Sequence, residues 1–228
     1  REVFITAAAR TAIGDFGGGL KDVAPIDLGA TVVKAVLQRS GVDGSAVGHL
    51  AFGHVVHTEP RDMYLSRVVA LNAGLPQSCA AFNVNRLCGS GLDAVGTAAR
   101  AIKSGEASLM IAGGVESMSR APFVMPKAEG AFSRNNAVYD TTIGWRFVNK
   151  LMKVQYGVDS MPETAENVAV DYKIEREAQD LMALRSQRNA MAAIQAGYFA
   201  HEICPVTIPQ KKGDAVVVSQ DEHPRDTS

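Results

Sequence analysis

Residues 85–94 read Asn-Arg-Leu-Cys-Gly-Ser-Gly-Leu-Asp-Ala, and they join an apolar segment to an amphipathic one made of small residues. The segment before them, residues 80–84, is typical of a buried strand, and residues 89–104 are typical of a helix. A strand that runs through a tight glycine turn into a helix is the repeating element of α/β folds. We therefore predict that Cys88 lies between the end of a strand and the start of a helix.

The same alternation of strand and helix patterns extends over the first 119 residues. Short apolar runs are followed by amphipathic stretches that end at glycine or proline. This order predicts βαβ units, a largely parallel sheet and right-handed crossovers. The predicted strands are residues 3–8, 49–56, 80–84 and the apolar run 108–112, and the predicted helices are residues 25–39, 62–72 and 89–104.

The composition of the chain changes near residue 119. Sixteen of the 21 glycines lie at or before Gly114, and charged residues are denser after residue 120. We therefore predict two domains, residues 1–119 and residues 120–228. In the second domain we expect irregular structure over 120–161, helices at 163–172 and 176–196, and strands at 203–208 and 215–218.

The overall composition excludes several classes of protein. The 228 residues carry 23 basic and 24 acidic side chains, which gives no electrostatic case for binding nucleic acid. The longest apolar run, residues 109–115, is far shorter than the ~20 residues of a membrane helix. The amino end resembles a strand and not a signal peptide. Three cysteines make a disulfide framework improbable and favour the reducing cytoplasm as the location.

Cys88 is the strongest candidate for chemistry. The start of a helix favours a thiolate over a thiol, and flanking Gly89 and Gly91 permit a substrate to come close. A free cysteine is most often a small core residue. The position of Cys88 at a strand-to-helix switch, where α/β folds place ligands, overrides that expectation. Cys79 and Cys204 lack such flanks, and we assign them to the core.

Other motifs allow weaker interpretations. Gly89, Gly91 and Ala94 fit a dinucleotide fingerprint, with Glu116 as the acid that would meet the ribose. His54 and His57 could form a metal pair, but on a strand their rings would face opposite sides, so we expect a solvated loop end and no metal site. Residues 14–19 are rich in glycine but lack the Gly-Lys-Ser/Thr ending of a phosphate-binding loop.

Several motifs occur together in an order that resembles the thiolase family. They are residues 85–91 (Asn-Arg-Leu-Cys-Gly-Ser-Gly), residues 113–119 (Gly-Gly-Val-Glu-Ser-Met-Ser) and residues 164–169 (Thr-Ala-Glu-Asn-Val-Ala). Residues 10–14 and 197–199 fit the same pattern, so the resemblance covers the whole chain. Within the family the chain looks most like 3-oxoadipyl-CoA thiolases, and it also has features of biosynthetic β-ketothiolases.

The resemblance implies an α/β fold with five αβαβα layers built from two similar halves. Residues 1–119 would then form most of the amino-terminal half and carry the nucleophile. Residues 120–228 would form the loop domain that covers the active site and binds coenzyme A. The Gly-His-Pro, Cys-x-Gly and Asn-Glu-Ala-Phe motifs of the family's carboxyl-terminal half do not occur here. We therefore expect this chain to be part of a longer enzyme.

The resemblance also assigns roles to individual residues. Cys88 matches the cysteine that is acylated in the family. Met161 matches a methionine of the acyl pocket, Met152 an apolar residue near the pantetheine, and Arg225 an arginine that contacts the coenzyme A nucleotide. Ser160 stands where many members have a histidine, which bears on the preference for the acyl chain.

The expected activity is that of an acyltransferase that works through an acyl-cysteine intermediate. It would cleave a 3-oxoacyl-CoA with coenzyme A, or run the reverse Claisen condensation of acetyl-CoA. We expect no resident cofactor, no metal, no nucleic acid and no membrane, and a homodimer or homotetramer. The alternatives are an NAD-binding oxidoreductase that uses Gly89, Gly91 and Ala94, and a non-catalytic protein that binds acyl-CoA.

Overall fold

The chain folds into two compact units in a computed structural model that describes residues 1–134 and 137–227. The first unit comprises Arg1–Ser119 and Gly197–His223, and the second comprises Arg120–Ala196 and Pro224–Ser228. The chain leaves the first unit at the position where the composition changes. It returns at Gly197, so residues 197–223, which we expected in the second domain, pack with the first unit.

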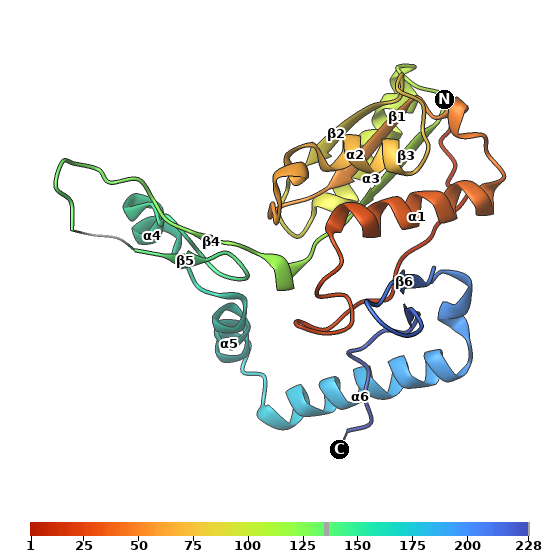
Figure 1. The fold of residues 1–228 in the computed structure, drawn as a ribbon. Helices are drawn as coiled ribbons and strands as arrows, with labels where there is room; N and C mark the ends of the chain where they lie inside the picture. Colours follow the sequence, from red (N-terminus) through yellow and green to blue (C-terminus); the bar gives the residue numbers. More distant parts are fainter. Residues whose placement is uncertain (135–136, 228) are drawn as a thin grey trace. The chain divides into compact units, whose positions relative to one another are not determined.

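The first unit contains a parallel sheet with the strand order β2-β1-β3 (Figure 1). The strands are β1 (His49–Gly53), β2 (Ala80–Val84) and β3 (Met110–Gly114). In the register of the sheet, Gly53 is level with both Val84 and Gly114. The carboxyl ends of all three strands therefore meet at one edge, which is where open α/β sheets place their ligands.

Three helices cover the sheet, and glycine or proline marks most of their ends. Helix α1 (Pro25–Ser40) begins with proline and ends at Gly41 in the left-handed conformation. Helix α3 (Ser90–Ser104) ends in the same way at Gly105, whereas α2 is Leu65–Asn72. Short 3₁₀ helices occupy Gly44–Ala46 and Pro60–Tyr64. The main core lies where α1 and α2 pack on the sheet, and its fully buried members include Ile26, Val33, Leu50, Leu65 and Val69.

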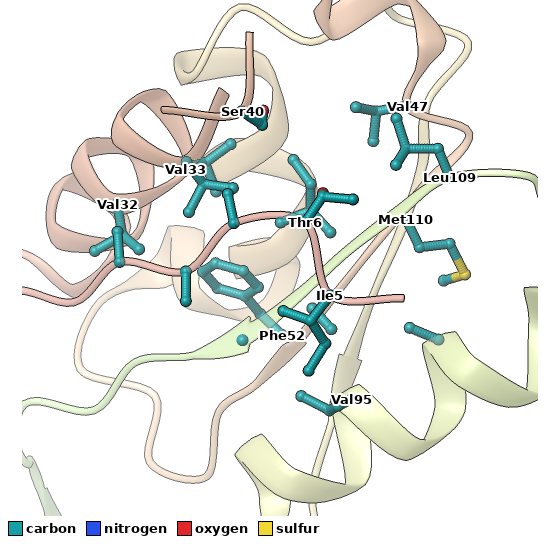
Figure 2. Close-up of a pocket in the computed structure, with 18 of the residues that line it drawn as sticks. Ile5, Thr6, Val32, Val33, Ser40, Val47, Phe52, Val95, Leu109 and Met110 are labelled. Carbon is teal, nitrogen blue, oxygen red and sulfur yellow. The ribbon is translucent and has the colours of Figure 1, made fainter. Parts of the chain in front are cut away.

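The predicted strand at residues 3–8 is wrong, because residues 1–9 have no regular structure. Within the described part of the chain, the first bridge is at the next residue, Arg10, which pairs with Ile203 where the chain returns to the unit. Without a strand partner, Phe4 and Ile5 remain 75% and 81% exposed. They lie along an apolar groove of about 1170 Å³ that is also lined by α1, α3 and β3 (Figure 2).

The returning segment adds a small β-sheet and a second core to the first unit. After a 3₁₀ turn at Tyr198–His201, β6 (Val206–Ile208) pairs antiparallel with β7 (Val216–Val218). This second core gathers Ala12, Leu20, Leu28, Val206 and Val218. The predicted strands at 203–208 and 215–218 are therefore present in shortened form.

An ion pair between Arg10 and Asp221 joins the two segments of the first unit. Asp221, whose side chain is 8% exposed, accepts hydrogen bonds from both terminal nitrogens of Arg10 at 2.7 and 2.9 Å. It also accepts from the backbone N–H of Ile13 at 2.8 Å. The hydrogen bond from Arg10 lowers the pKa of Asp221, against the opposing effect of burial. The ionised form of Asp221 is therefore the one that stabilises the fold.

We expect Asp221→Asn to lower the free energy of unfolding at pH 7 by about 2 kcal/mol, the scale of a hydrogen bond to a charged group. A carboxyl whose pKa is lowered by folding stabilises the protein above its unfolded pKa of about 3.9, and this contribution is lost as the pH falls through the folded pKa. Urea denaturation should therefore separate the variant from wild type at pH 7, and the gap should narrow toward pH 2. Asp214→Asn, on an exposed turn, is the control. A gap that is independent of pH would contradict the assignment.

The second unit contains more regular structure than we predicted. Strands β4 (Phe123–Val124) and β5 (Tyr139–Asp140) form an antiparallel pair, and α4 occupies Lys150–Tyr156, all within the stretch expected to be irregular. Helix α4 is short, but the Asn149 side chain caps its start by accepting from the N–H of Met152. Helices α5 (Met161–Asp171) and α6 (Arg176–Gln195) lie close to their predicted positions.

The second unit has little core of its own. Among its described residues no hydrophobic side chain is buried, and Leu151, Val154 and Val170 are at least 73% exposed. Over residues 1–134 and 137–227, no helix combines the length and apolar character needed to cross a bilayer.

Candidate active site

Cys88 lies in the turn between β2 and α3, as predicted, and its side chain is exposed. The residue before it, Leu87, has a φ of +50°, a left-handed conformation that costs free energy for a side chain of this size. The amide of Leu87 is held by the Asn85 side chain at 3.1 Å. A strained turn thus carries the exposed thiol at the carboxyl edge of the sheet.

The side chain of Ser90 fastens this turn, residues 85–90, which we call the cysteine turn. Its hydroxyl accepts from the N–H of Arg86 at 2.8 Å and donates to the carbonyl oxygen of Leu87 at 2.6 Å. Ser90 is 4% exposed and is the first residue of α3, so the helix holds the turn directly. Sequence reasoning missed this role of Ser90. Asn and Ser side chains often form hydrogen bonds to nearby backbone groups in turns, so Asn85 and Ser90 were the signal that could have revealed it.

The other two cysteines are core residues, as predicted. Cys79 is 1% exposed and Cys204 is 6% exposed. Burial raises the pKa of the Cys79 thiol and that of the Cys204 thiol, which makes both poor nucleophiles at neutral pH. Cys88 is the only exposed thiol in the sequence, since all three cysteines fall within the described residues.

Backbone packing brings β1 and β3 close to the cysteine turn. A Cβ atom added to Gly53 would lie 2.7 Å from the backbone nitrogen of Gly91 and 2.7 Å from the carbonyl carbon of Ser90. A Cβ atom on Gly114 would lie 3.0 Å from the carbonyl oxygen of Gly53. The start of α3 can lie against the end of β1 only because Gly53 lacks a side chain, and Gly114 in turn leaves room for the backbone of Gly53.

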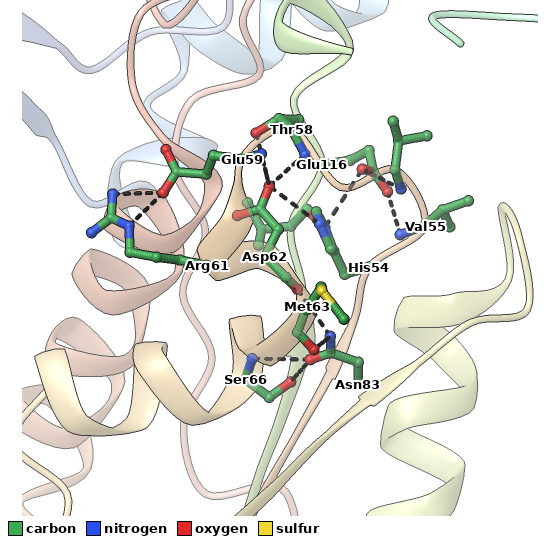
Figure 3. Close-up of polar contacts among 12 residues, drawn as sticks. His54, Val55, Thr58, Glu59, Arg61, Asp62, Met63, Ser66, Asn83 and Glu116 are labelled. Atoms are coloured by element: carbon green, nitrogen blue, oxygen red, sulfur yellow. Dashed lines mark hydrogen bonds and ion pairs between the residues drawn. The ribbon is translucent and has the colours of Figure 1, made fainter. Parts of the chain in front are cut away.

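A polar cluster of His54, Asp62 and Glu116 lies at the same edge of the sheet (Figure 3). His54 follows β1 directly, and its Nδ1 lies 2.9 Å from the carbonyl oxygen of Val115 and 3.5 Å from Glu116 Oε1. Its Nε2 lies 3.7 Å from Asp62 Oδ2. The side chains of His54 and Asp62 are both fully buried, whereas that of Glu116 is 34% exposed.

The expected arrangement of His54 and His57 is wrong. The two rings stack with centroids 5.4 Å apart, and His54 is buried instead of lying at a solvated loop end. The physical reason is that β1 ends at Gly53, so the alternation of side chains along a strand does not continue to residue 57. In the described part of the chain, no group of three or more His, Cys, Asp or Glu side chains is arranged to hold a metal ion.

Asp62 of the polar cluster forms hydrogen bonds to the segment after β1 and to strand β2. Asp62 Oδ2 accepts from the N–H and the hydroxyl of Thr58 at 2.6 and 2.8 Å. The Asn83 amide in β2 donates to the carbonyl oxygen of Asp62 at 3.2 Å and accepts from the hydroxyl of Ser66 at 2.6 Å. These hydrogen bonds fix the loop after β1 against the strand that leads to Cys88.

The Glu116 carboxylate is occupied by hydrogen bonds to the segment that follows β1. Its two carboxylate oxygens accept from the N–H groups of Val55 and Val56 at 2.9 and 3.1 Å. A carboxylate that holds a neighbouring loop in this way is not presented to a ribose. The geometry therefore gives no support to the dinucleotide alternative.

The remaining predicted residues belong to the second unit. Met152 lies in α4 and is 39% exposed, Met161 begins α5 and is 68% exposed, and Arg225 is exposed after β7. The N–H of Arg225 donates to Gln187 Oε1 in α6 at 2.9 Å. Roles for these three residues in binding the acyl group and coenzyme A stay predictions.

Ser160 has a structural role that the sequence comparison with a histidine did not reveal. It is the N-cap of α5, and it forms a capping box with Glu163. The backbone N–H of Ser160 donates to the Glu163 carboxylate at 2.6 Å, which lowers the pKa of Glu163. The Ser-x-x-Glu spacing before the helix was the signal that could have revealed this.

Comparison with known proteins agrees with this geometry. Residues 3–228 match the family described as "Thiolase, N-terminal domain". The chain is 55% identical over 226 residues to the beta-ketoadipyl-CoA thiolase of Pseudomonas aeruginosa. It is 52% identical to the 3-oxoadipyl-CoA/3-oxo-5,6-dehydrosuberyl-CoA thiolase of Escherichia coli. Each alignment covers 99% of this chain and 56% of the relative, so the chain spans about half the length of these curated relatives.

A solved structure is similar to the chain as well. The crystal structure of the Bacillus anthracis acetyl-CoA acetyltransferase superposes with a TM-score of 0.84 at 37% sequence identity. The match covers 97% of this chain and 54% of that one. The similarity therefore extends over both units and is not confined to the motif around Cys88.

Proposed function

Because this chain belongs to the thiolase family and has its α/β fold, we propose that it carries the acyl-accepting part of an acetyl-CoA C-acyltransferase. The observation that carries the proposal is the exposed thiol of Cys88 on a strained turn at the carboxyl edge of the parallel sheet. Both other thiols are buried. A sulfur held at the start of a helix and open to solvent is suited to nucleophilic attack on a carbonyl carbon, either the 3-oxo carbon of a 3-oxoacyl-CoA or the thioester carbon of acetyl-CoA.

In the proposed thiolysis, the Cys88 thiolate attacks the 3-oxo carbon of a 3-oxoacyl-CoA. The bond between carbons 2 and 3 breaks, the electron pair passes to carbon 2, and protonation there releases acetyl-CoA. The shortened acyl group remains on Cys88 as a thioester. The thiolate of coenzyme A then attacks this thioester, releases the new acyl-CoA and restores the Cys88 thiolate. Condensation follows the same steps in reverse.

Two further requirements follow from this chemistry. Oxyanions form at the attacked carbonyl, and backbone N–H groups at the start of α3 are suitable donors to them. Proton transfers at carbon and sulfur need a general acid and base, which we assign to the part of the relatives that this chain does not span. Coenzyme A takes part as a substrate and not as a resident cofactor.

The names of the relatives bear on the substrate. Both act, by name, on 3-oxoadipyl-CoA (β-ketoadipyl-CoA), and the Escherichia coli relative also on 3-oxo-5,6-dehydrosuberyl-CoA. We propose a 3-oxoacyl-CoA of this kind or an acetoacetyl-CoA-like one. Met161 and Met152 would contact the acyl chain and the pantetheine, and Arg225 the nucleotide. We place the enzyme in the cytoplasm as a homodimer or homotetramer.

The test is acetylation by acetyl-CoA. Full-length protein incubated with acetyl-CoA should gain one acetyl group, and peptide mapping should place that group on Cys88. Cys204→Ala should label normally, because its thiol is buried and its pKa is raised. Label that persists in Cys88→Ala would defeat the assignment.

A further inference from the structure

The glycine-rich loop at residues 14–19, which we call the glycine loop, binds an anion that the chain itself supplies. Glu222 accepts hydrogen bonds from the N–H of Asp15 at 2.7 Å and from the N–H of Gly19 at 2.9 Å. Two backbone N–H groups thus hold one carboxylate in the manner of an anion-binding loop. The loop resembles a phosphate-binding loop in this respect only.

Two glycines of this loop, Gly18 and Gly19, leave open the space that the Glu222 carboxylate occupies. A Cβ atom added to Gly18 would lie 2.2 Å from Glu222 Oε2, and one added to Gly19 would lie 2.7 Å from Oε1. Side chains at these positions would compete with Glu222 for the same space. The loop is therefore shaped around Glu222.

The same loop holds both points where the chain passes from the first unit into the second. Ser119 is the last residue of the first unit before one junction, and its hydroxyl accepts from the N–H of Gly17 at 2.8 Å. His223 is the last residue before the other junction, and its Nδ1 lies 2.5 Å from Asp15 Oδ1. Two junctions 104 positions apart in the chain are thus held by five consecutive residues, 15–19.

Adjacent contacts strengthen the attachment. The N–H of Glu222 donates to the carbonyl oxygen of Ile13 at 3.0 Å, and the neighbouring Asp221 forms the ion pair with Arg10. Arg10 also pairs with Glu202 at 3.0 Å and lies over the ring of Phe199 at 5.2 Å. The segment 10–19 therefore holds the chain near all three crossings between the units.

Arg225 follows Glu222 by three residues. Three steps along the chain span at most about 11 Å between Cα atoms, so fixing Glu222 limits where Arg225 can lie. Pro224 between them restricts the backbone further. Within the second unit, the N–H of Arg225 donates to Gln187 Oε1 at 2.9 Å.

We propose that the glycine loop is the anchor for both junctions, and that Glu222 is a positioning residue for Arg225. The second part rests on the proposed function, because it takes Arg225 to contact the nucleotide of coenzyme A. Glu222 acts through the loop and the chain, and it has no direct part in the chemistry.

The test uses Glu222→Gln in the full-length enzyme, because glutamine keeps the shape of the side chain and removes its charge. Hydrogen exchange followed by mass spectrometry should show peptides that contain Asp15 and Gly19, and those spanning residues 222–227, exchanging about tenfold faster. Peptides from β1 to β3 should be unchanged. The KM for coenzyme A should rise about fivefold while kcat stays within about twofold. Glu106→Gln, an exposed substitution in the same unit, is the charge control.

A second variant addresses the loop from the other side. Gly18→Ala should reproduce the exchange pattern, because its Cβ would displace the Glu222 carboxylate, whereas Gly130→Ala adds its Cβ in open space and should not. Unchanged exchange in both Glu222→Gln and Gly18→Ala would overturn the anchor. Faster exchange with an unchanged KM for coenzyme A would overturn the positioning of Arg225. Absence of acetylation at Cys88 in wild type would defeat the proposed function alone, since the exchange result does not depend on it.

Discussion

Cys88→Ala is expected to reduce the rate of thiolysis by at least about 10⁴-fold, because no other group can carry the acyl chain between the two half-reactions. The loss should appear in kcat and not in KM, since the thiol is a reacting group and contributes little to binding. The measurement is the rate at which full-length enzyme cleaves acetoacetyl-CoA and 3-oxoadipyl-CoA. The loss of absorbance of the 3-oxothioester reports this rate.

Stability provides the control for this variant. Cys88 is exposed, so its replacement should leave the free energy of unfolding within about 0.5 kcal/mol of wild type. Cys79→Ala should lower the free energy of unfolding, because it leaves a cavity at a buried site. It should keep its activity, because Cys88 is still present. A Cys88→Ala enzyme with more than a few per cent of wild-type activity would disprove an acyl-cysteine at this position.

Gly53→Ala is expected to have the second largest effect, on both stability and activity. The added Cβ would lie within 2.7 Å of backbone atoms of Ser90 and Gly91, and backbone atoms cannot swing away as a side chain would. The start of α3 must therefore move from the sheet. We expect a loss of about 3 kcal/mol in the free energy of unfolding, typical of severe overpacking. A shift of about 1 Å in the cysteine turn should also lower kcat about 100-fold.

A matched glycine in the same strand region serves as the control. A Cβ atom on Gly48 would meet its nearest neighbours, Leu109 and Ala107, at 3.7 and 3.8 Å, which is ordinary contact. Gly48→Ala should therefore unfold within about 1 kcal/mol of wild type and keep its activity. Thermal or urea unfolding measured beside the thiolysis assay compares the two variants. Equal behaviour of the two would show that the contact between β1 and α3 is not tight.

The elements around Cys88 could be predicted because their signals are local. Proline at the start and glycine at the end mark α1, and the apolar run before the Cys-Gly-Ser-Gly sequence marks β2 and then α3. The family motifs predicted the class of chemistry. The match of residues 3–228 to the thiolase N-terminal domain supports that prediction.

Other features depend on contacts that a linear pattern does not contain. Residues 3–8 have the composition of a strand, but a strand forms only beside a partner, and no strand among the described residues pairs with them. Helix α4 is seven residues long and is defined largely by its Asn149 cap. The roles of Gly53 and Gly114 follow from the register of a parallel sheet, which the sequence does not specify.

The candidate site was predicted only in part for the same reason. Cys88 was identified from its neighbours in the chain, whereas the polar cluster joins residues that follow β1 and β3 with one from the 3₁₀ helix Pro60–Tyr64. His54 was expected to be solvated. It is buried beside Asp62 and Glu116, which lie eight and 62 positions away in the chain, and a local pattern does not show such neighbours.

The ion pair between Arg10 and Asp221 joins residues that are 211 positions apart. On a ribosome that extends the chain from its amino end at about 5–20 residues per second, Arg10 emerges roughly ten seconds or more before Asp221. Throughout that interval Asp221 and Glu222 are unavailable to Arg10 and to the glycine loop. Arg10 can reach Glu202 only after most of the chain has emerged, and the small sheet of β6 and β7 is completed just before Asp221. The first unit therefore completes its folding late, and a nascent chain arrested before residue 221 presents an open, partly apolar amino-terminal region to chaperones.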